Sequence, residues 1–384
     1  MGTTFFVLAL LQCALLFFLS RVGSRLDREE RKPAPQRTHW PRTGLIVPAG
    51  GNHPRMREAL ESLLKQDYPA LYPVIVTATA DEPAAGIELQ ARYPQLRHVV
   101  AGFAKGCGQK NHNSLKGVEA VEDEVELLAF CDSTHIAPRD FIRRLVAPVV
   151  DGEDFSTGYH KVVARDTGIV TMAYALCVQL MRYLQGISSF TQLWGGAMCF
   201  RLSAFRRYGV REFWMSNVVD DCSLADRLIH LGARIRLSGD AVLMTEAREH
   251  DLGVWHHWMD RQILFLKFCI PYQWVLLGVL ACLMLLPVLW AVLAVLGVLL
   301  GKLSFGWLVG VLVYAAALAL VLRSWAHFQE AVFPVWRWMV AFCASACMFV
   351  WVYLGTILAE GVLWQGIWYE VGRQGRVIRM RRQK

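Results

Sequence analysis

The chain of 384 residues is 55% hydrophobic and only 19% charged, and its mean hydropathy is positive. This composition excludes a wholly soluble protein, yet the middle of the chain is ordinary, so a membrane protein with one sizeable soluble domain fits. The net charge of +8 is concentrated in 21–37 and 373–384, beside apolar segments, which favours anionic lipid head groups over nucleic acid as partner.

Several long apolar stretches are candidates for membrane helices: 4–19, 274–300, 305–322 and 339–359. All but the first reach or nearly reach the length that crosses a hydrocarbon core. The first lacks the charged start and the cleavage site of a signal peptide, so we expect a retained anchor at 1–20. A basic and proline-rich linker, 21–42, follows it, and the positive-inside rule places this linker and the domain after it in the cytoplasm.

The ten cysteines are scattered singly, and their spacing matches no metal-binding motif. A cytoplasmic domain is in a reducing environment, which disfavours disulfides. We therefore interpret the cysteines of the soluble part as small core residues.

Beyond the linker, predicted strands alternate with predicted helices. The apolar runs and turn residues favour a short strand within 43–51, where TGLIVPAGG runs into a Pro/Gly turn, and strands at 72–79, 96–101 and 125–131, with helices at 54–66, 87–93 and 113–121. Such an alternation predicts a parallel, right-handed α/β sheet.

Gly50, Asp81 and Asp132 each come just after one of these strands. Because the carboxyl ends of parallel strands meet at one edge, we expect all three on the rim where open α/β sheets hold their ligands. Asp132 ends a seven-residue apolar run, Val125–Cys131, that is typical of a strand buried on both faces. From this stretch alone, Asp132 is as well explained by capping of the next helix as by ligand binding.

A further apolar segment, Val170–Leu184, predicts a helix with few charges. Two interpretations remain open at this point. The helix either belongs to the core or lies in the plane of the membrane interface, as helices with one large apolar face do.

From Thr43 to about Phe268 the chain resembles the family 2 nucleotide-sugar glycosyltransferases, most closely the ceramide glucosyltransferase-like branch of membrane-bound lipid glycosyltransferases. The segments that carry the resemblance are LIVPAGGN, SLLKQDYP, ADEPA with ARYP, QKNHNSL, AFCDST, WGGAMCFR and VVDDCSLADRL. The resemblance implies a GT-A domain over 43–268, with a Rossmann-like mixed sheet that holds a UDP-sugar and a divalent metal, Mg²⁺ or Mn²⁺.

Carried over residue by residue, the resemblance implies donor-site roles for four residues. Asp81 is similar to the acidic residue that faces the uridine. Lys110 and Asn111 resemble the polar contacts to the nucleotide, and Pro48 belongs to the strand end that lines the donor site.

The resemblance also implies roles for the carboxylates. Asp132 is similar to the first carboxylate of the metal-binding DxD, and Asp221 to the catalytic base, with Asp220 as the alternative. The second DxD carboxylate is absent, so Thr134 or His135 would contribute weakly or the metal would depend on the phosphates. Without the resemblance, the Asp220–Asp221 pair is better explained as a cap of the following helix.

The chemistry of the reaction requires these residue types. A leaving diphosphate needs a hard cation with oxygen ligands, and a hydroxyl acceptor needs a carboxylate to take its proton. Displacement opposite the leaving UDP inverts the anomeric centre and requires no protein nucleophile, and the sequence contains no GxSxG motif.

A degenerate form of the Q/RxxRW signature lies in WHHWMDRQILFLK, residues 255–267. Trp258, Arg261 and Gln262 would grip the diphosphate and the acceptor, and an Arg opposite a diphosphate makes physical sense. A basic flank before the membrane is the competing explanation. The adjacent His256 and His257 point apart on a helix, so we interpret them as interfacial side chains rather than metal ligands.

The number of membrane crossings in 269–360 determines on which side of the membrane the tail lies. Three crossings after residue 274 would leave the basic tail, 361–384, on the side opposite the catalytic domain, against the positive-inside rule. We therefore expect that Trp336–Ala359 lies in the interface or re-enters without spanning. The stretch LWQGIWYEVGRQG resembles the WxGxxY segment that ends many relatives on the cytoplasmic face, which favours the same solution.

The sequence thus predicts a multi-pass inner-membrane protein whose cytoplasmic domain is an inverting, metal-dependent hexosyltransferase. The expected reaction moves a hexose from a UDP-sugar to the hydroxyl of a membrane lipid. Two alternatives remain: a processive polysaccharide synthase, which should carry a fuller QxxRW and a second DxD carboxylate, and a catalytically degenerate membrane scaffold, which need not bind nucleotide or metal.

Overall fold

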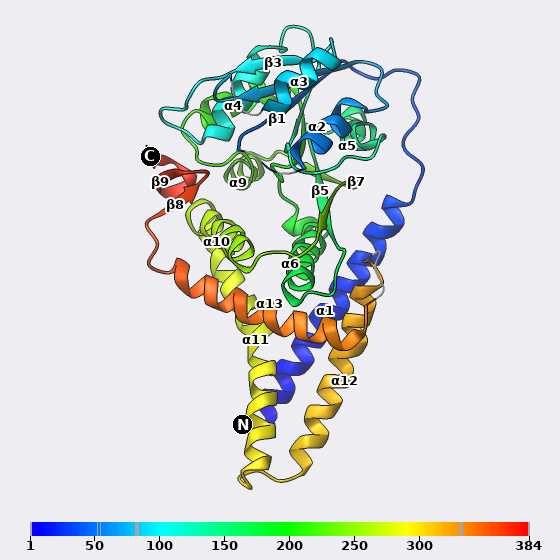
Figure 1. The fold of residues 1–384 in the computed structure, drawn as a ribbon, viewed down its shortest axis with the longest axis vertical. Coiled ribbons are helices and arrows are strands. Elements are labelled where there is room, and N and C mark those ends of the chain that lie inside the picture. Colours follow the sequence, from blue (N-terminus) through cyan, green and yellow to red (C-terminus); the bar gives the residue numbers. More distant parts are fainter. Residues whose placement is uncertain (1, 52, 54, 81–83, 330–332, 383–384) are drawn as a thin grey trace.

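The computed structural model describes residues 2–51, 53, 55–80, 84–329 and 333–382. A domain built around a sheet lies at one end of the molecule, and long helices extend from it to the other end (Figure 1). The chain enters the sheet domain from one of these helices and returns to the others afterwards.

The main sheet has seven strands in the order β3-β2-β1-β4-β6-β5-β7. The first four strands along the chain are mutually parallel, as predicted, whereas β6 runs antiparallel to both of its neighbours, so the expected mixed α/β sheet is confirmed. The strands are β1 Thr43–Pro48, β2 Leu71–Thr77, β3 Arg97–Val100, β4 Leu127–Cys131, β5 Phe155–Ala164, β6 Ala197–Arg201 and β7 Ile235–Ala247.

Helices cover both faces of this sheet because successive residues of a strand point to opposite sides. In β1, Leu45 and Val47 pack with α2 (Met56–Leu64) and α5 (Phe141–Val150), whereas Ile46 packs with helices on the other face. The other helices of the domain are α3 Ala84–Arg92, α4 Gln109–Glu119, α7 Leu202–Arg207, α8 Val210–Trp214 and α9 Cys222–His230.

Two more helices join the sheet domain to the membrane part. The predicted apolar helix is α6, Ile169–Gln185, and most of its residues are buried in a core shared with β5 and the membrane helices. The other connecting helix is α10, Leu252–Cys269, which begins where the carboxylate of Asp251 accepts a hydrogen bond from the Val254 N–H.

Four helices of the described part are long and apolar enough to cross a membrane: α1 Gly2–Glu30, α11 Pro271–Leu299, α12 Gly306–Ala326 and α13 Val335–Thr356. Three of them extend away from the sheet domain, whereas α13 lies across them directly beneath that domain (Figure 1). The packing agrees, since α13 contacts α6 and α10 as well as α11 and α12.

The N-terminal helix is longer than the predicted anchor of residues 1–20 and includes the first part of the expected linker. No proline interrupts it before Pro33, and charge pairs one turn apart, Arg25–Glu29 and Asp27–Arg31, support its last turns. The linker proper therefore begins after Glu30.

The C-terminal segment, predicted only as a basic tail, folds into an antiparallel sheet of three strands: β8 Gly361–Trp364, β9 Ile367–Val371 and β10 Val377–Arg382. Gln365 and Gly366, both at positive φ, form the tight turn between β8 and β9. Alternate residues of β9 are buried against α10, and this alternation drives the tail to fold.

Candidate functional site

Charged side chains from three separate elements meet at the carboxyl end of β4. Asp132 directly follows this strand, and its Oδ1 lies 2.7 Å from the Nζ of Lys110 on α4. The same ammonium lies 3.0 Å from Oδ2 of Asp220, in the segment before α9. The structure thus places Lys110 and Asp220 next to Asp132, which was predicted to lie on this rim.

The two carboxylates that share Lys110 differ in access. The side chain of Asp132 is 30% exposed, whereas that of Asp220 is 4% exposed. Burial opposes ionisation of Asp132, but the Lys110 ammonium outweighs it and brings the pKa of Asp132 below its ordinary value. For Asp220, burial together with the charges of Asp221 and Asp132 outweighs Lys110 and raises the pKa to about 6. Only Asp132 of this pair is open to a ligand.

Asp221 is held by two main-chain donors. Its Oδ1 accepts a hydrogen bond from the Cys222 N–H at 2.6 Å, which caps α9, and its Oδ2 accepts one from the Gly195 N–H at 3.1 Å. A carboxylate has about four acceptor positions, so capping leaves room for a proton or a hydroxyl donor. The two roles considered for Asp221 are thus compatible.

Gly195 is a site residue that we did not predict. Its carbonyl accepts a hydrogen bond from Lys110 at 2.9 Å, and a Cβ at this position would lie 2.7 Å from the Asp220 carboxylate. Only glycine permits this close approach. The signal in the sequence was the Trp194-Gly195-Gly196 segment, which we noted but gave no role.

Asn111 does not face the cleft as a nucleotide contact would. Its side chain is fully buried, and its Nδ2 donates to the carbonyls of Asn217 at 2.9 Å and Val219 at 3.1 Å. Consecutive residues of a helix point about 100° apart, so Lys110 and Asn111 cannot both face the same ligand. Asn111 instead fixes the segment that carries Asp220.

The remaining predicted donor residues lie at the ends of β1 and β2. Pro48 ends β1 and is half-buried, and a Cβ on Gly50 would lie 3.3 Å from Oε1 of Gln365, so the β8–β9 turn reaches this part of the rim. Asp81, predicted to face the uridine, lies outside the described residues.

The residues predicted as a degenerate Q/RxxRW signature lie on α10, and all three are half-buried. The Arg261 guanidinium lies 5.5 Å from the ring centroid of Trp364. Burial lowers the pKa of Arg261, although the negative charges of Asp132 and Asp221 act to raise it, so this cation lies within electrostatic range of both carboxylates. Trp258 contacts the ring of Tyr174 edge to face, at 5.2 Å between centroids. Gln262 lies beside Arg261 on the same helix.

A hollow of about 220 Å³ opens beside the cluster at Thr134, two residues beyond Asp132. Arg55, Tyr174, His250 and Trp258 are among its lining residues, and the ring of Tyr174 stacks on His250 at 4.2 Å. This volume lies somewhat below the range of about 300–1,000 Å³ that is usual for small-molecule sites. We refer to this space as the rim cavity.

The residues around Asp132 fit a metal held jointly with a ligand. Within the described ranges, no group of three or more His, Cys, Asp or Glu side chains forms a metal site by itself. Mg²⁺ and Mn²⁺ sites on phosphate substrates commonly use one or two carboxylates and take the other ligands from phosphate and water. Asp132 supplies one accessible carboxylate. Burial lowers the pKa of the neighbouring His135 to about 4, so its ring is neutral near pH 7, and its Nε2 lies 3.8 Å from Oδ2 of Asp132.

The C-terminal sheet touches two of the segments that carry site residues, which the sequence analysis did not predict. The Tyr369 hydroxyl accepts a hydrogen bond at 3.2 Å from the N–H of Gln109, in the first turn of the helix that bears Lys110. Val218 N–H donates to the Gly375 carbonyl at 2.9 Å, just before the acidic pair. The WxGxxY-like stretch was the available signal, but we used it only to place the tail.

A family model described as Glycosyl transferase family 21 matches residues 4–377, beyond the stretch 43–268 that carried the resemblance. Among solved structures, the chain is similar to the mannosyltransferase PcManGT from Pyrobaculum calidifontis in complex with GDP-Man and Mn²⁺. The TM-score is 0.56 at 18% identity, over 92% of this chain and 98% of that chain, and this likeness shows a shared fold. A crystal structure of a mycobacterial protein matches with a TM-score of 0.34 at 15% identity, over 63% of this chain and 76% of that chain.

Proposed function

The chain belongs to glycosyl transferase family 21, and on this premise we propose that it transfers a hexose from a UDP-sugar to the hydroxyl of a membrane lipid, with inversion, as a ceramide glucosyltransferase does. The observation that carries the proposal is the cluster of Lys110, Asp132 and Asp220, with Asp221 beside it, in a domain joined at both ends to long apolar helices. The solved relative in complex with GDP-Man and Mn²⁺ supports a nucleotide-sugar donor and a divalent metal.

In the proposed donor site, Asp132 holds the metal and Arg261 faces the diphosphate. A bound Mg²⁺ or Mn²⁺ would neutralise charge on the leaving diphosphate. Arg261 adds a guanidinium whose fork suits phosphate oxygens, and its partial burial strengthens the attraction. Pro48 and Asp81 are proposed to line the nucleoside end of the site. Lys110 keeps Asp132 ionised and in place, so the carboxylate is ready for the cation.

In the proposed transfer step, Asp221 takes the proton of the attacking lipid hydroxyl. Its two hydrogen bonds from main-chain N–H groups fix the carboxylate in one orientation. A fixed base within hydrogen-bond reach lowers the barrier for attack by a weak nucleophile. Attack opposite the leaving UDP inverts the anomeric carbon in one displacement. Asp220, sealed beneath Lys110, is proposed to position this group rather than act as the base.

We propose that α1, α11 and α12 span the inner membrane and that α13 lies at its cytoplasmic surface. The crosswise course of α13 beneath the sheet domain supports this arrangement (Figure 1). With three spans, the basic end of α1, the sheet domain and the tail all lie on one side, which agrees with the positive-inside rule. The proposed domains are the anchor α1, the linker after Glu30, the transferase domain 43–268, the membrane segment 269–360 and the C-terminal sheet.

The test is transfer by the purified full-length protein in lipid nanodiscs. UDP-glucose or GDP-mannose, each with Mg²⁺ or Mn²⁺, is supplied with ceramide or diacylglycerol, and nucleotide release and glycolipid are measured. Loss of a general base should lower the rate by roughly 10²–10⁴-fold in Asp221→Asn. Asp226→Asn, on the same helix but paired with His230, is the matched control and should retain the parent's rate.

If neither donor releases nucleotide, or if Asp221→Asn transfers as fast as the parent protein, the proposal fails. Long polymeric products on a gel would indicate a processive synthase instead. Binding of neither UDP nor metal by calorimetry would indicate a scaffold.

A further inference from the structure

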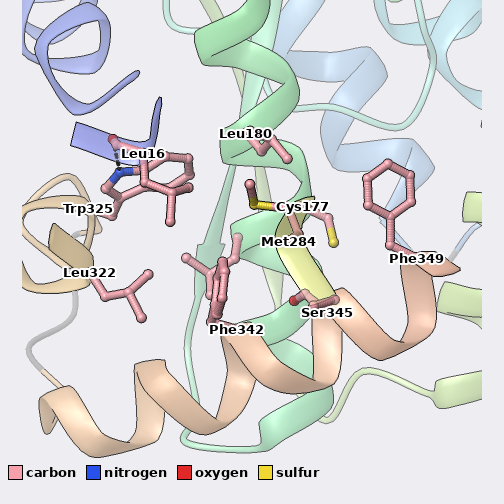
Figure 2. Close-up of a pocket in the computed structure, with 11 residues that line it drawn as sticks. Leu16, Cys177, Leu180, Met284, Leu322, Trp325, Phe342, Ser345 and Phe349 are labelled. Carbon is pink, nitrogen blue, oxygen red and sulfur yellow. Dashed lines mark hydrogen bonds between the residues drawn. The ribbon is translucent and has the colours of Figure 1, made fainter. Parts of the chain in front are cut away.

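Helix α6 borders a small hollow and a larger one. The small hollow lies among α1, α6, α11, α12 and α13, measures about 40 Å³ and is lined by side chains such as Leu16, Cys177, Leu180 and Phe342 (Figure 2). A space of this size holds at most a few water molecules, and its hydrocarbon walls give water few partners. The larger hollow is the rim cavity, of about 220 Å³, and it is the one with room for part of a ligand.

Aromatic rings hold Tyr174, a residue of α6, in the wall of the rim cavity. The ring of His250, just before α10, stacks on it at 4.2 Å between centroids, and Trp258 on α10 meets it edge to face at 5.2 Å. The main chain is tied as well, since the His250 N–H donates to Oγ1 of Thr171 on α6 at 3.1 Å. The ring of Tyr174 is therefore fixed before a ligand arrives, which lowers the entropy cost of binding.

Two polar groups in this wall have no protein partner. In the part of the chain that the structure describes, nothing forms a hydrogen bond with the Tyr174 hydroxyl, although this residue is only 8% exposed. Nε2 of His250, in the ring stacked on it, is also buried without a partner. Buried tyrosine hydroxyls usually find a hydrogen-bond partner, because losing water without a replacement costs stability. The occupant of the rim cavity is the partner that remains available.

The charged side chains around the rim cavity are balanced. Arg55 donates to Oε2 of Glu246 at 3.0 Å, and Arg165 donates to Oε1 of the same carboxylate at 2.7 Å. Arg248, an exposed lining residue, lies within electrostatic range of Asp166. A ligand anion would thus meet the Glu246 carboxylate, and a ligand cation would meet guanidinium groups. The wall therefore favours a group without net charge.

The other polar groups of the wall can both donate and accept hydrogen bonds. Burial lowers the pKa of His53 and that of His250, so both rings are neutral near pH 7, and a neutral imidazole has one donor and one acceptor nitrogen. The hydroxyls of Thr134 and Tyr174 have the same double capacity. So do the hydroxyls of a sugar or polyol, whereas an ionised carboxylate only accepts. The wall thus matches a neutral polyhydroxylated group.

The rim cavity lies next to the proposed metal-binding carboxylate. The wall residues 244–247 end β7 at one edge of the sheet, whereas the proposed nucleoside end lies at β1 and β2, on the other side of β4. The Thr245 hydroxyl lies 2.6 Å from Nδ1 of His135, and Nε2 of the same ring lies 3.8 Å from Oδ2 of Asp132. A sugar attached to a diphosphate at Asp132, or a group that reacts with it, thus has the cavity beside it.

We propose that the rim cavity binds a neutral polyhydroxylated group and that the Tyr174 hydroxyl positions it. The inference rests on the transfer reaction proposed above, in which two parts have this chemistry: the hexose of the donor, and a sugar or polyol in the head of the acceptor. In either case the site discriminates by charge. A hexuronate would place a second carboxylate beside Glu246, so we expect a neutral hexose to bind better than its uronate.

The experiment compares Tyr174→Phe with the parent protein, both full-length in lipid nanodiscs. Calorimetry measures the affinities for UDP and UDP-glucose, for GDP and GDP-mannose, and for octyl glucoside below its micelle concentration. If the cavity holds the donor hexose, Tyr174→Phe weakens nucleotide-sugar binding by roughly 3–10-fold, the value of one hydrogen bond, and leaves the bare nucleotide unchanged. If the cavity holds the acceptor head, octyl glucoside binding weakens by a similar factor and donor affinity stays the same.

Tyr183→Phe is the matched control. It removes a hydroxyl from the same helix, where Gln179 donates to that hydroxyl at 2.6 Å, and should leave all of these affinities unchanged. Glu246→Gln is a second variant that does not alter Tyr174. It removes one carboxylate from the wall, so the preference for the neutral hexose over its uronate, measured with UDP-glucuronate or octyl glucuronide, should fall several-fold.

The inference is overturned if Tyr174→Phe binds the nucleotide sugars and octyl glucoside as tightly as the parent protein, because the cavity would then hold water only. An unchanged preference in Glu246→Gln would overturn the discrimination by charge. Selective loss of sugar binding in Tyr174→Phe, in a protein that transfers no hexose, would support the cavity assignment and defeat the proposed function. Sugar transfer by the parent protein with no effect of Tyr174→Phe on binding would do the reverse.

Discussion

At the scale of single residues, the site depends on how one ammonium is shared. Lys110 pairs with the accessible Asp132 and the sealed Asp220 at the same time. A change in the charge of Asp220 therefore alters the hold of Lys110 on Asp132 without any contact between Asp220 and the substrate. Gly195 makes this geometry possible because it has no side chain.

The raised pKa of Asp220 predicts a pH dependence. With a pKa of about 6 in place of the ordinary value near 3.9, Asp220 is ionised above about pH 6 and protonated below it. Between about pH 4 and 6 the folded protein thus binds a proton that the unfolded chain does not, so ionised Asp220 lowers the stability above pH 6, and this cost disappears on acidification. Protonation weakens its pairing with Lys110, and we expect kcat/KM to fall below about pH 6.

The measurement is the pH profile of kcat/KM for the parent protein and for Asp220→Asn. The variant should show a lower plateau and no decline with this apparent pKa, because its amide does not titrate. The same decline in both proteins would assign it to another group.

Residue types and order predicted part of this site. Asp132 could be placed at the rim because an apolar strand ends at it, whereas the role of Asp221 as the base comes from the resemblance and stays a prediction. Asn111 is buried rather than directed toward the rim. A motif shows which residues are adjacent in the sequence but not where their side chains point, and consecutive residues of a helix point about 100° apart. Gly195 was missed because its role is the absence of a side chain beside a residue distant in the sequence.

At the scale of secondary structure elements, the C-terminal sheet belongs to the site. It supports α4 through Tyr369, the segment before Asp220 through Gly375, and Arg261 through Trp364. Gly375 is at φ +77°, and a Cβ there would lie 2.4 Å from Oδ1 of Asn217 and 2.8 Å from Sγ of Cys269. The sheet therefore docks only with glycine at this position.

Gly375→Ala should undock the C-terminal sheet and weaken donor binding. Gly232→Ala is the matched control: Gly232 has the same φ of +77°, but a Cβ there would meet nothing within 4 Å. In both variants the left-handed backbone conformation of the new alanine costs about 1–2 kcal/mol of stability, and only Gly375→Ala adds a steric clash. Limited proteolysis should cut the tail faster in Gly375→Ala than in Gly232→Ala, and calorimetry should show weaker UDP binding in Gly375→Ala. Equal protection and equal affinity in both variants would exclude a role for the docked sheet.

The predicted elements were most accurate where the pattern was strongest. The four parallel strands were each found within a few positions, although β3 begins with Arg97 and His98 and has the shortest apolar run. By contrast, β7 alternates at Arg236, Ser238 and Asp240 and then changes to a continuous apolar run at 241–244, so its 13 residues show no single pattern. The tail alternates in β9, but its positive charge led us to regard it as solvated rather than folded.

At the scale of the whole molecule, the arrangement of the helices predicts the topology. The α11–α12 turn at 300–305 lies at the end of the molecule remote from the sheet domain, whereas the tail lies beside that domain (Figure 1). Composition alone did not decide whether α13 spans, because its hydropathy satisfies the requirement for a span. Its crosswise packing against α6 and α10 was not visible in the sequence.

A protease site inserted at 301–305 and another inserted at 373–375 should be cut from opposite faces of the membrane. In inside-out vesicles we expect cleavage only at 373–375, and in spheroplasts only at 301–305. Cleavage of both sites from the same face would show that α13 spans and that the proposed orientation of the tail is wrong.

The tail has a further consequence for biosynthesis, because residues 369 and 375 are made after the sheet domain and the helical hairpin. The anchor, the sheet domain and the helical hairpin are all made before the segment that secures Lys110 and Asp220. A polypeptide that terminates prematurely at about residue 360 would insert and retain its core, yet have no assembled catalytic centre. We therefore expect copies that end near residue 360 to transfer no sugar and to consume no donor.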